Sequence, residues 1–307
     1  MERKIKLEEI RKAVETAYDE YKRIDKGEVD ARLEGVNADA FGVVFMLNDG
    51  TVVKKGDTGV AAPLGDIANF IVHSVLLQQL GAEGLVKKAG KHPDGCCCKA
   101  LDVPVCPHAV RAVSAVTPTG DFDSKYDLVA DNAVAMMGSA PVLDDKLYER
   151  LSKEVVDSDE ENKLADARYE VFDETGESLD TYVKLESLTV TAEQLADLGV
   201  TVAANGIEPT TRVAAFDGSL TKSMTTIAAV HGRPDRNRRW LLRSGVPAIW
   251  GFGGLILAIM PGLGAIAAYS PRIGKHGRSK KGARAIVEIT NSIGYSIFSG
   301  DTYTVEE

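Results

Sequence analysis

The stretch SGVPAIWGFGGLILAIMPGLGAIAAYS, residues 244–270, decides the fold. It contains no charged side chain, and its length alone would be enough to span a bilayer. Its prolines and glycines, however, divide it into pieces that are too short to cross a membrane. Two apolar runs, LILAIM and GAIAAYS, are separated by a Pro-Gly-Leu-Gly turn. We therefore expect two buried strands joined by a hairpin, and no membrane-spanning segment.

A second hairpin is predicted near the N-terminus. FGVVFML (41–47) and TVVKKG (51–56) are separated by Asn-Asp-Gly, a strong hairpin signal. Apolar residues spaced by three and four predict an amphipathic helix over residues 5–24, and a last helix is expected over residues 279–293. Strands near both chain ends favour one antiparallel sheet that is completed by distant segments.

The middle of the chain is predicted to be mainly helical. We expect helices at residues 66–81, 144–170, 179–199 and 219–230, and a loop-rich region at residues 82–140. The pattern indicates an α+β fold of the α/β sandwich type, with helices flanking the sheet and a helical subdomain. We assign residues 1–62 and 240–307 to the sheet-containing subdomain and residues 63–239 to the helical subdomain, within one compact unit.

Composition narrows the functions that the chain can have. Its 307 residues carry a net charge of −9, which disfavours non-specific binding of nucleic acid. The N-terminus has no apolar core of a signal peptide. Four cysteines (Cys96, Cys97, Cys98, Cys106) lie close together and offer no disulfide framework, so we expect a reduced, cytoplasmic protein. Cys96 and Cys98 are too close for the usual zinc spacing, so we expect neither a metal nor a cofactor.

Three segments resemble a known family. They are GEVDARLEGVNADAFGVVFMLNDGTVVKKGDTG (27–59), GKHPDG (90–95) and RSGVPAIWGFGGLILAIMPGLGAIAAYSP (243–271). In this order they are similar to the serine-dependent glutaminases, which belong to the β-lactamase and penicillin-binding-protein superfamily. The resemblance extends from about residue 27 to residue 298. It implies a β-lactamase-like fold, a homo-oligomer and, in an intact member, hydrolysis of the glutamine amide.

The family's catalytic pair is replaced in this chain. A serine begins a helix, and a lysine one turn later removes its proton so that the serine can attack a carbonyl. Counting from Gly56-Asp57 without gaps, the serine becomes Asp66 and the lysine becomes Asn69. We interpret Asp66 as a helix N-cap rather than a nucleophile. Asn69 cannot take up a proton, so we expect glutaminase activity to be absent.

Other family positions follow from the same resemblance. Substrate contacts and the hairpin lysine are replaced by Val110, Pro234 and Ile249. Matching positions that would line a glutamine pocket are Glu154, Asn162 and Tyr182, and the backbone N–H groups of Asp66 and Phe252 would form the oxyanion hole. From the residues alone, a second interpretation is at least as good: Glu154 as a solvated helix glutamate, Asn162 as a surface asparagine and Tyr182 as a core tyrosine. The bulk of Trp250 and Phe252 predicts a filled pocket, with no open cavity reaching Asp66.

Two further patterns keep other functions open. Ser219-Leu220-Thr221-Lys222 repeats the Ser-x-x-Lys spacing, although we favour Ser219 as an N-cap. A basic run comprises Arg233, Arg236, Arg238, Arg239 and Arg243, and we favour a solvated face that pairs with nearby acids. The hypotheses are thus a glutaminase-like pseudoenzyme or redesigned scaffold, an amidohydrolase using Ser219 and Lys222, and a binding module for a small anion or amino acid.

Overall fold

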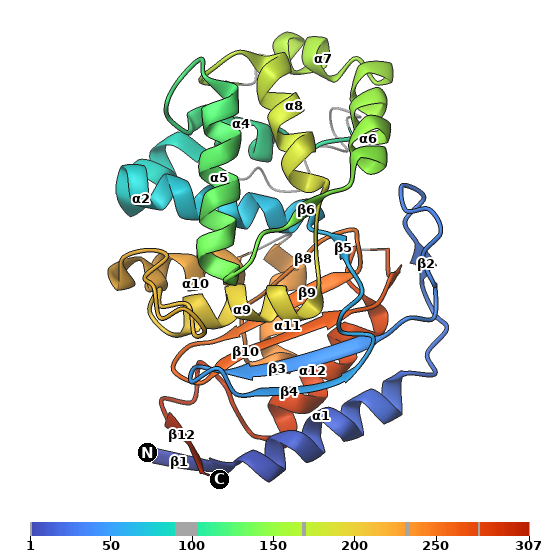
Figure 1. Cartoon of the computed structure of the whole chain (residues 1–307), viewed down its shortest axis with the longest axis vertical. Coiled ribbons are helices and arrows are strands. Elements are labelled where there is room, and N and C mark those ends of the chain that lie inside the picture. Colours follow the sequence, from blue (N-terminus) through green and yellow to red (C-terminus); the bar gives the residue numbers. More distant parts are fainter. Residues whose placement is uncertain (1, 90–103, 168–169, 231–233, 276, 307) are drawn as a thin grey trace.

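A central sheet organises the lower half of the molecule in Figure 1. The computed structural model describes residues 2–89, 104–167, 170–230, 234–275 and 277–306. Within these residues, a five-stranded antiparallel sheet has the order β4-β3-β10-β9-β8. Its strands are β3 (Gly42–Leu47), β4 (Val52–Gly56), β8 (Ala248–Trp250), β9 (Leu255–Met260) and β10 (Gly264–Tyr269). Both predicted hairpins and the sheet built from the two chain ends are therefore confirmed.

Helices cover both faces of this sheet. α1 (Leu7–Tyr21) and α12 (Lys280–Ser292) pack against one face, and α9 (Ala192–Ala203) packs against the other. Gly199 allows α9 to approach closely, because an added Cβ would lie 2.6 Å from the Cβ of Ala265. The covered faces explain the apolar character of β9 and β10, in which every side chain is buried. Among the described helices, none combines the length and apolar character that crossing a membrane requires.

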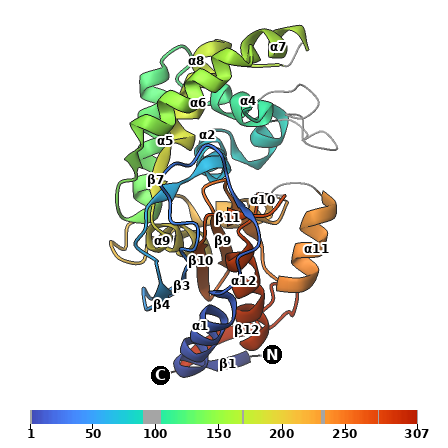
Figure 2. The ribbon, with the colours of Figure 1, turned by 90° about the vertical axis from the view of Figure 1, so that its right-hand side faces the viewer.

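The two chain ends also meet. β1 (Glu2–Lys6) pairs in parallel with β12 (Thr302–Glu306), and Figure 1 shows both below the main sheet. The sequence did not predict this pair, because each strand is short and mostly exposed. Figure 2 shows how α1, α12 and the terminal strands lie together at the base of the molecule.

The upper half of the molecule is helical. Its helices are α2 (Ala68–Ala89), α4 (Pro107–Ala115), α5 (Phe122–Met137), α6 (Asp145–Asp157), α7 (Glu160–Asp166) and α8 (Thr175–Glu186). A small sheet of order β5-β7-β6 lies beside them, formed by β5 (Ala62–Pro63), β6 (Val142–Leu143) and β7 (Leu188–Val190). The predicted boundaries between the subdomains stay a prediction, although α9 from the middle of the chain packs on the sheet.

Six further elements complete the described part of the fold. They are β2 (Glu28–Val29), the 3-10 turn η1 (Gly65–Ile67), η2 (Gly218–Leu220), α10 (Thr221–Ala229), α11 (Pro234–Ser244) and β11 (Arg272–Ile273). β2 pairs with β11, so a segment before the sheet is held next to the loop that precedes α12. Figure 2 shows α11 beside α12, to which it is also linked by contacts.

Three predictions about the middle of the chain were wrong. Residues 179–199 form two helices with β7 between them, because Thr191 and Gln194 make a reciprocal capping box that starts α9. Residues 144–170 are not one helix, since the left-handed Asp159 separates α6 from α7. In the described part of residues 82–140, α4 and α5 replace the expected loops, and both bury apolar faces in the core.

Candidate functional site

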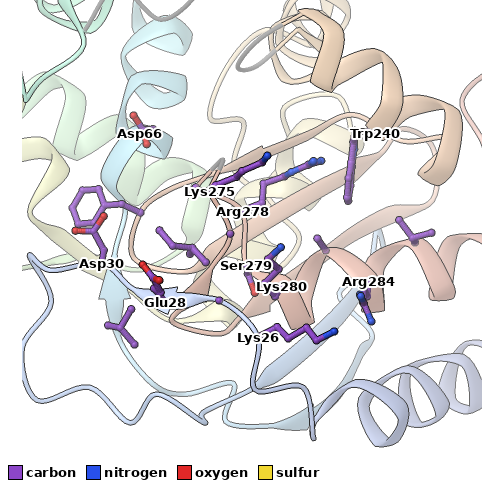
Figure 3. A pocket seen from close by; sticks show the side chains of 18 of the residues that line it. Lys26, Glu28, Asp30, Asp66, Trp240, Lys275, Arg278, Ser279, Lys280 and Arg284 are labelled. Carbon is purple, nitrogen blue, oxygen red and sulfur yellow. The ribbon is translucent and has the colours of Figure 1, made fainter. Parts of the chain in front are cut away.

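A large open cavity lies between the start of α12, α11 and the segment around β2. It has a volume of about 1270 Å³ and is bordered by Asp66 and Phe252 as well as by Trp240 on α11 (Figure 3). The cavity exceeds the usual size of a small-molecule site. The prediction of a filled pocket was wrong, because open space reaches Asp66.

Asp66 lies inside the turn η1, directly before α2. Its side chain is exposed and makes no hydrogen bond among the described residues, so the predicted N-cap was wrong. Asn69 follows one turn later and is half-buried. Its Oδ1 is buried and has no hydrogen-bond partner within the described structure. The chain therefore has a free carboxylate and an amide where the Ser-x-x-Lys pair was expected.

Phe252 seals one wall of the site. It lies in the turn between β8 and β9, and a Cβ on Gly65 would come within 2.6 Å of its ring. On its other side the guanidinium of Arg32 lies 3.8 Å from the ring centroid. Arg32 is held there by both carboxylate oxygens of Asp30, at 2.8 and 2.9 Å. Because the ring is fixed between η1 and Arg32, it leaves the side of Asp66 that faces the cavity open.

A buried acid lies close behind Asp66. Glu186, at the end of α8, is 4% exposed, and Tyr182 one turn earlier is fully buried. Burial raises the pKa of Glu186 to about 8; the nearby Asp66 carboxylate adds to the increase, and Arg32 opposes it. Burial also raises the pKa of Tyr182 well above its ordinary value. The folded protein therefore favours the protonated form of Glu186 near neutral pH.

The other positions expected to contact glutamine lie away from this cavity. Glu154 is exposed on α6, and Asn162 is exposed on α7, where its amide donates to Asp159 at 2.7 Å. Tyr182 belongs to the core. Thus the structure places Asp66 and Phe252 on the cavity wall, with Asn69 one turn further along the chain and Tyr182 buried nearby. Glu154 and Asn162 do not border this cavity. Their assignment to a glutamine pocket stays a prediction.

Basic side chains dominate the cavity wall. Eight basic and three acidic side chains line it, an excess of five positive charges in a chain whose net charge is −9. Six of the basic residues form no ion pair within the part of the chain that the structure describes: Lys26, Arg239, Arg243, Lys275, Lys280 and Arg284. For Arg239 and Arg243, the two members of the basic run in this cavity, the expected solvated face is confirmed, but the expected pairing with nearby acids is wrong among the described residues. Arg233 lies outside the described residues, as does the side chain of Arg236.

Two other sequence candidates lie elsewhere. Ser219 and Lys222 are exposed at η2 and the start of α10, and neither borders the cavity at Asp66. Asp217 caps this turn by accepting from the Ser219 N–H at 2.8 Å, so Ser219 itself is not the N-cap. Cys96, Cys97 and Cys98 lie outside the described residues, and Cys106 directly precedes α4. Among the described residues, no group of three or more potential ligands could hold a metal ion.

The comparison with known proteins identifies the family. The Glutaminase family profile matches residues 28–298. This chain belongs to the glutaminase family. The Glutaminase of Parabacteroides distasonis is 30% identical to it over 99% of both chains. The Glutaminase of Bacteroides thetaiotaomicron is 31% identical over 97% of this chain and 98% of its own.

Solved glutaminase structures share the fold. The probable glutaminase ybaS superposes with a TM-score of 0.86 at 22% identity, over 96% of this chain and all of its own. The Bacillus subtilis glutaminase YbgJ, solved as a covalent complex with 5-oxo-L-norleucine, gives a TM-score of 0.79 at 19% identity, over 94% and 98% of the two chains. The β-lactamase-like fold expected from the resemblance is thereby confirmed.

Proposed function

We propose that this glutaminase-family protein does not release ammonia from L-glutamine and is a pseudoenzyme or a redesigned scaffold. The observation that carries this proposal is the pair of side chains at the start of α2. Asp66 is an exposed carboxylate at the cavity, and Asn69 one turn later has no basic nitrogen. A serine nucleophile and a base that could accept its proton are both missing from these positions. A carboxylate at Asp66 would also repel a developing oxyanion.

A mechanism-based inhibitor tests this proposal. 6-diazo-5-oxo-L-norleucine reacts with the Bacillus subtilis glutaminase to form its covalent complex. We expect the intact mass of this protein to stay unchanged after incubation with the reagent, because it lacks the nucleophile. The Bacillus subtilis enzyme, treated in parallel, should gain mass. A stoichiometric mass increase mapped to Asp66 or Ser219 would contradict the proposal.

An amidohydrolase that uses Ser219 and Lys222 has less support. Both side chains are exposed, whereas an activated serine needs a base held against it and a site that excludes water. If this alternative were correct, ammonia release from L-glutamine would be measurable and would be lost in the Ser219→Ala variant.

Ligand binding is the second candidate role. The open cavity at Asp66 and its unpaired cations favour a small anion or an amino acid as the ligand. By family resemblance we also expect a homo-oligomer, and the cytoplasmic location remains part of this proposal.

A further inference from the structure

The charges around the cavity are segregated. In the view of Figure 3, the labelled acids Glu28, Asp30 and Asp66 lie at one side of the cavity, and the basic side chains from α12 and the loop before it lie toward the other. Asp30 is already neutralised by its bidentate pair with Arg32. The basic side is therefore the part of the cavity where an anion would be stabilised.

Three separate elements converge on this basic side. α11 contributes Arg239 and Arg243, the loop after β11 contributes Lys275, and the first residues of α12 contribute Lys280 and Arg284. None of these five makes an ion pair with a described residue. Each is also exposed, so its charge remains available to a ligand in solution. Like charges held near one another repel, and a multiply charged anion would relieve that repulsion.

A buried tryptophan lines the basic side of the cavity. Trp240 is 5% exposed, and its indole N–H donates to the Val246 carbonyl at 2.8 Å. The guanidinium of Arg278 lies 5.3 Å from the Trp240 ring and 4.9 Å from the Trp250 ring. Both tryptophans of the chain are therefore next to the loop that carries Lys275 and Arg278. A ligand bound there would change their fluorescence.

We propose that the α11–α12 side of this cavity binds a small molecule that carries several phosphate groups. This inference rests on the proposed binding role and specifies its ligand class; it is independent of whether hydrolysis is lost. A single carboxylate would satisfy few of the five cations, whereas a polyphosphate offers many oxygens. A guanidinium group can donate two parallel hydrogen bonds to one phosphate group, so the arginines in this set favour phosphate as the anion.

The neighbouring charges limit where the phosphates lie. Arg243 and Arg284 also border an adjacent cavity of about 600 Å³, which contains Glu20 and Glu288. At the opposite side, Asp66 is exposed and would repel phosphate. The phosphate groups therefore belong between these acids, near Arg239 and Lys280, and the uncharged or amine-bearing part of the ligand would extend toward Asp66.

Inorganic tripolyphosphate is the probe that tests the inference. Tryptophan fluorescence and thermal unfolding are followed at low salt for the full chain, with orthophosphate, L-glutamate and a single-stranded oligonucleotide as comparison probes. We expect tripolyphosphate to give a saturable change at lower concentration than any of the other three. The double variant R239A/K280A should weaken its binding about tenfold or more.

The matched control is K146A/K222A. It removes the same net charge from exposed lysines that do not border the cavity, so it should change binding less than about twofold. Equal weakening in both double variants would overturn the inference, because it would indicate non-specific attraction. Tighter binding of the oligonucleotide would overturn it as well. If L-glutamate alone saturates, the phosphate class is wrong and the binding role stands; if no probe changes fluorescence or melting temperature, both fail.

Discussion

Replacing Lys125 with methionine is expected to lower the free energy of unfolding by about 3–5 kcal/mol. Lys125 is fully buried on α5, and its ammonium pairs with Asp173, which is only 8% exposed. Methionine keeps the apolar stem but leaves the Asp173 carboxylate buried without its counter-ion. Urea unfolding at neutral pH measures the loss.

The local contacts explain why this pair matters. The Lys125 ammonium also donates to the Ser114 carbonyl at 3.2 Å, so it links α5 to the end of α4. Asp173 accepts from the backbone N–H groups of Gly120 and Glu174 at 2.7 and 2.9 Å. Burial by itself would raise the pKa of Asp173, but the Lys125 bond and these backbone bonds lower it below its ordinary value. The pair thus fastens the start of α5 to the segment before α8.

Two variants separate the pair from a general effect of substitution. Lys222→Met changes an exposed lysine on α10 and should alter stability by less than about 0.5 kcal/mol. The double variant K125M/D173N should recover part of the loss, because it removes both buried charges and keeps an amide oxygen that can accept from one of the two backbone N–H groups. If K125M alone stays within about 1 kcal/mol of the wild type, the buried pair does not have the role assigned to it.

Replacing Glu186 with glutamine is expected to stabilise the protein at alkaline pH. The folded pKa of Glu186 is about 8, whereas an unfolded glutamate ionises near 4.3. Between these values only the folded chain holds the proton. The contribution of Glu186 to the free energy of unfolding is therefore fully present below about pH 4 and is lost as the pH rises to about 8. The total loss is at most roughly 5 kcal/mol.

The prediction for Glu186→Gln follows because only the wild type loses this contribution to stability as the pH rises. The variant should lie within about 1 kcal/mol of the wild type at pH 5 and be more stable than it by about 3–5 kcal/mol at pH 9, because its amide cannot ionise. Urea unfolding at pH 5, 7 and 9 measures both curves. The control Glu154→Gln changes an exposed glutamate on α6 and should follow the wild type. Parallel curves for wild type and Glu186→Gln would show that Glu186 is ionised in the folded protein.

The sheet could be predicted from the sequence because short turn motifs mark its two hairpins. Asn48-Asp49-Gly50 fixed the first hairpin, and Pro261-Gly262-Leu263-Gly264 fixed the second. The strand β7 was missed because its leucine and valine continue the apolar pattern of the helices on both sides. Only the capping box at Thr191 marked the break, and it could have been recognised.

The candidate site was predictable only in part. The resemblance to the family predicted Asp66 and Asn69 at the start of a helix, and their side chains led to the prediction that glutaminase activity is absent. The raised pKa of Glu186 depends on burial and on groups far away in the sequence, Asp66 and Arg32, so no local pattern indicates it. The bulk of Phe252 suggested a filled pocket, but its direction is set by Gly65 and Arg32.

The basic side of the cavity could not be predicted from the sequence either. The arginine run before β8 was visible in the sequence, yet the structure assigns only Arg239 and Arg243 from it to the cavity wall. Lys26, Lys275 and Lys280 join them from separate segments through the pairing of β2 with β11. Convergence of this kind is a property of the tertiary fold, and spacing along the chain does not reveal it.

Ammonia release from L-glutamine tests the central claim most directly. The purified wild-type protein is assayed beside Asp66→Asn and Ser219→Ala variants, with the Bacillus subtilis glutaminase as the positive control. The account predicts that the wild type and both variants release no ammonia above a sample without protein, because Asp66 and Asn69 replace the nucleophile and its base. Turnover by the wild type that disappears in either variant would contradict it.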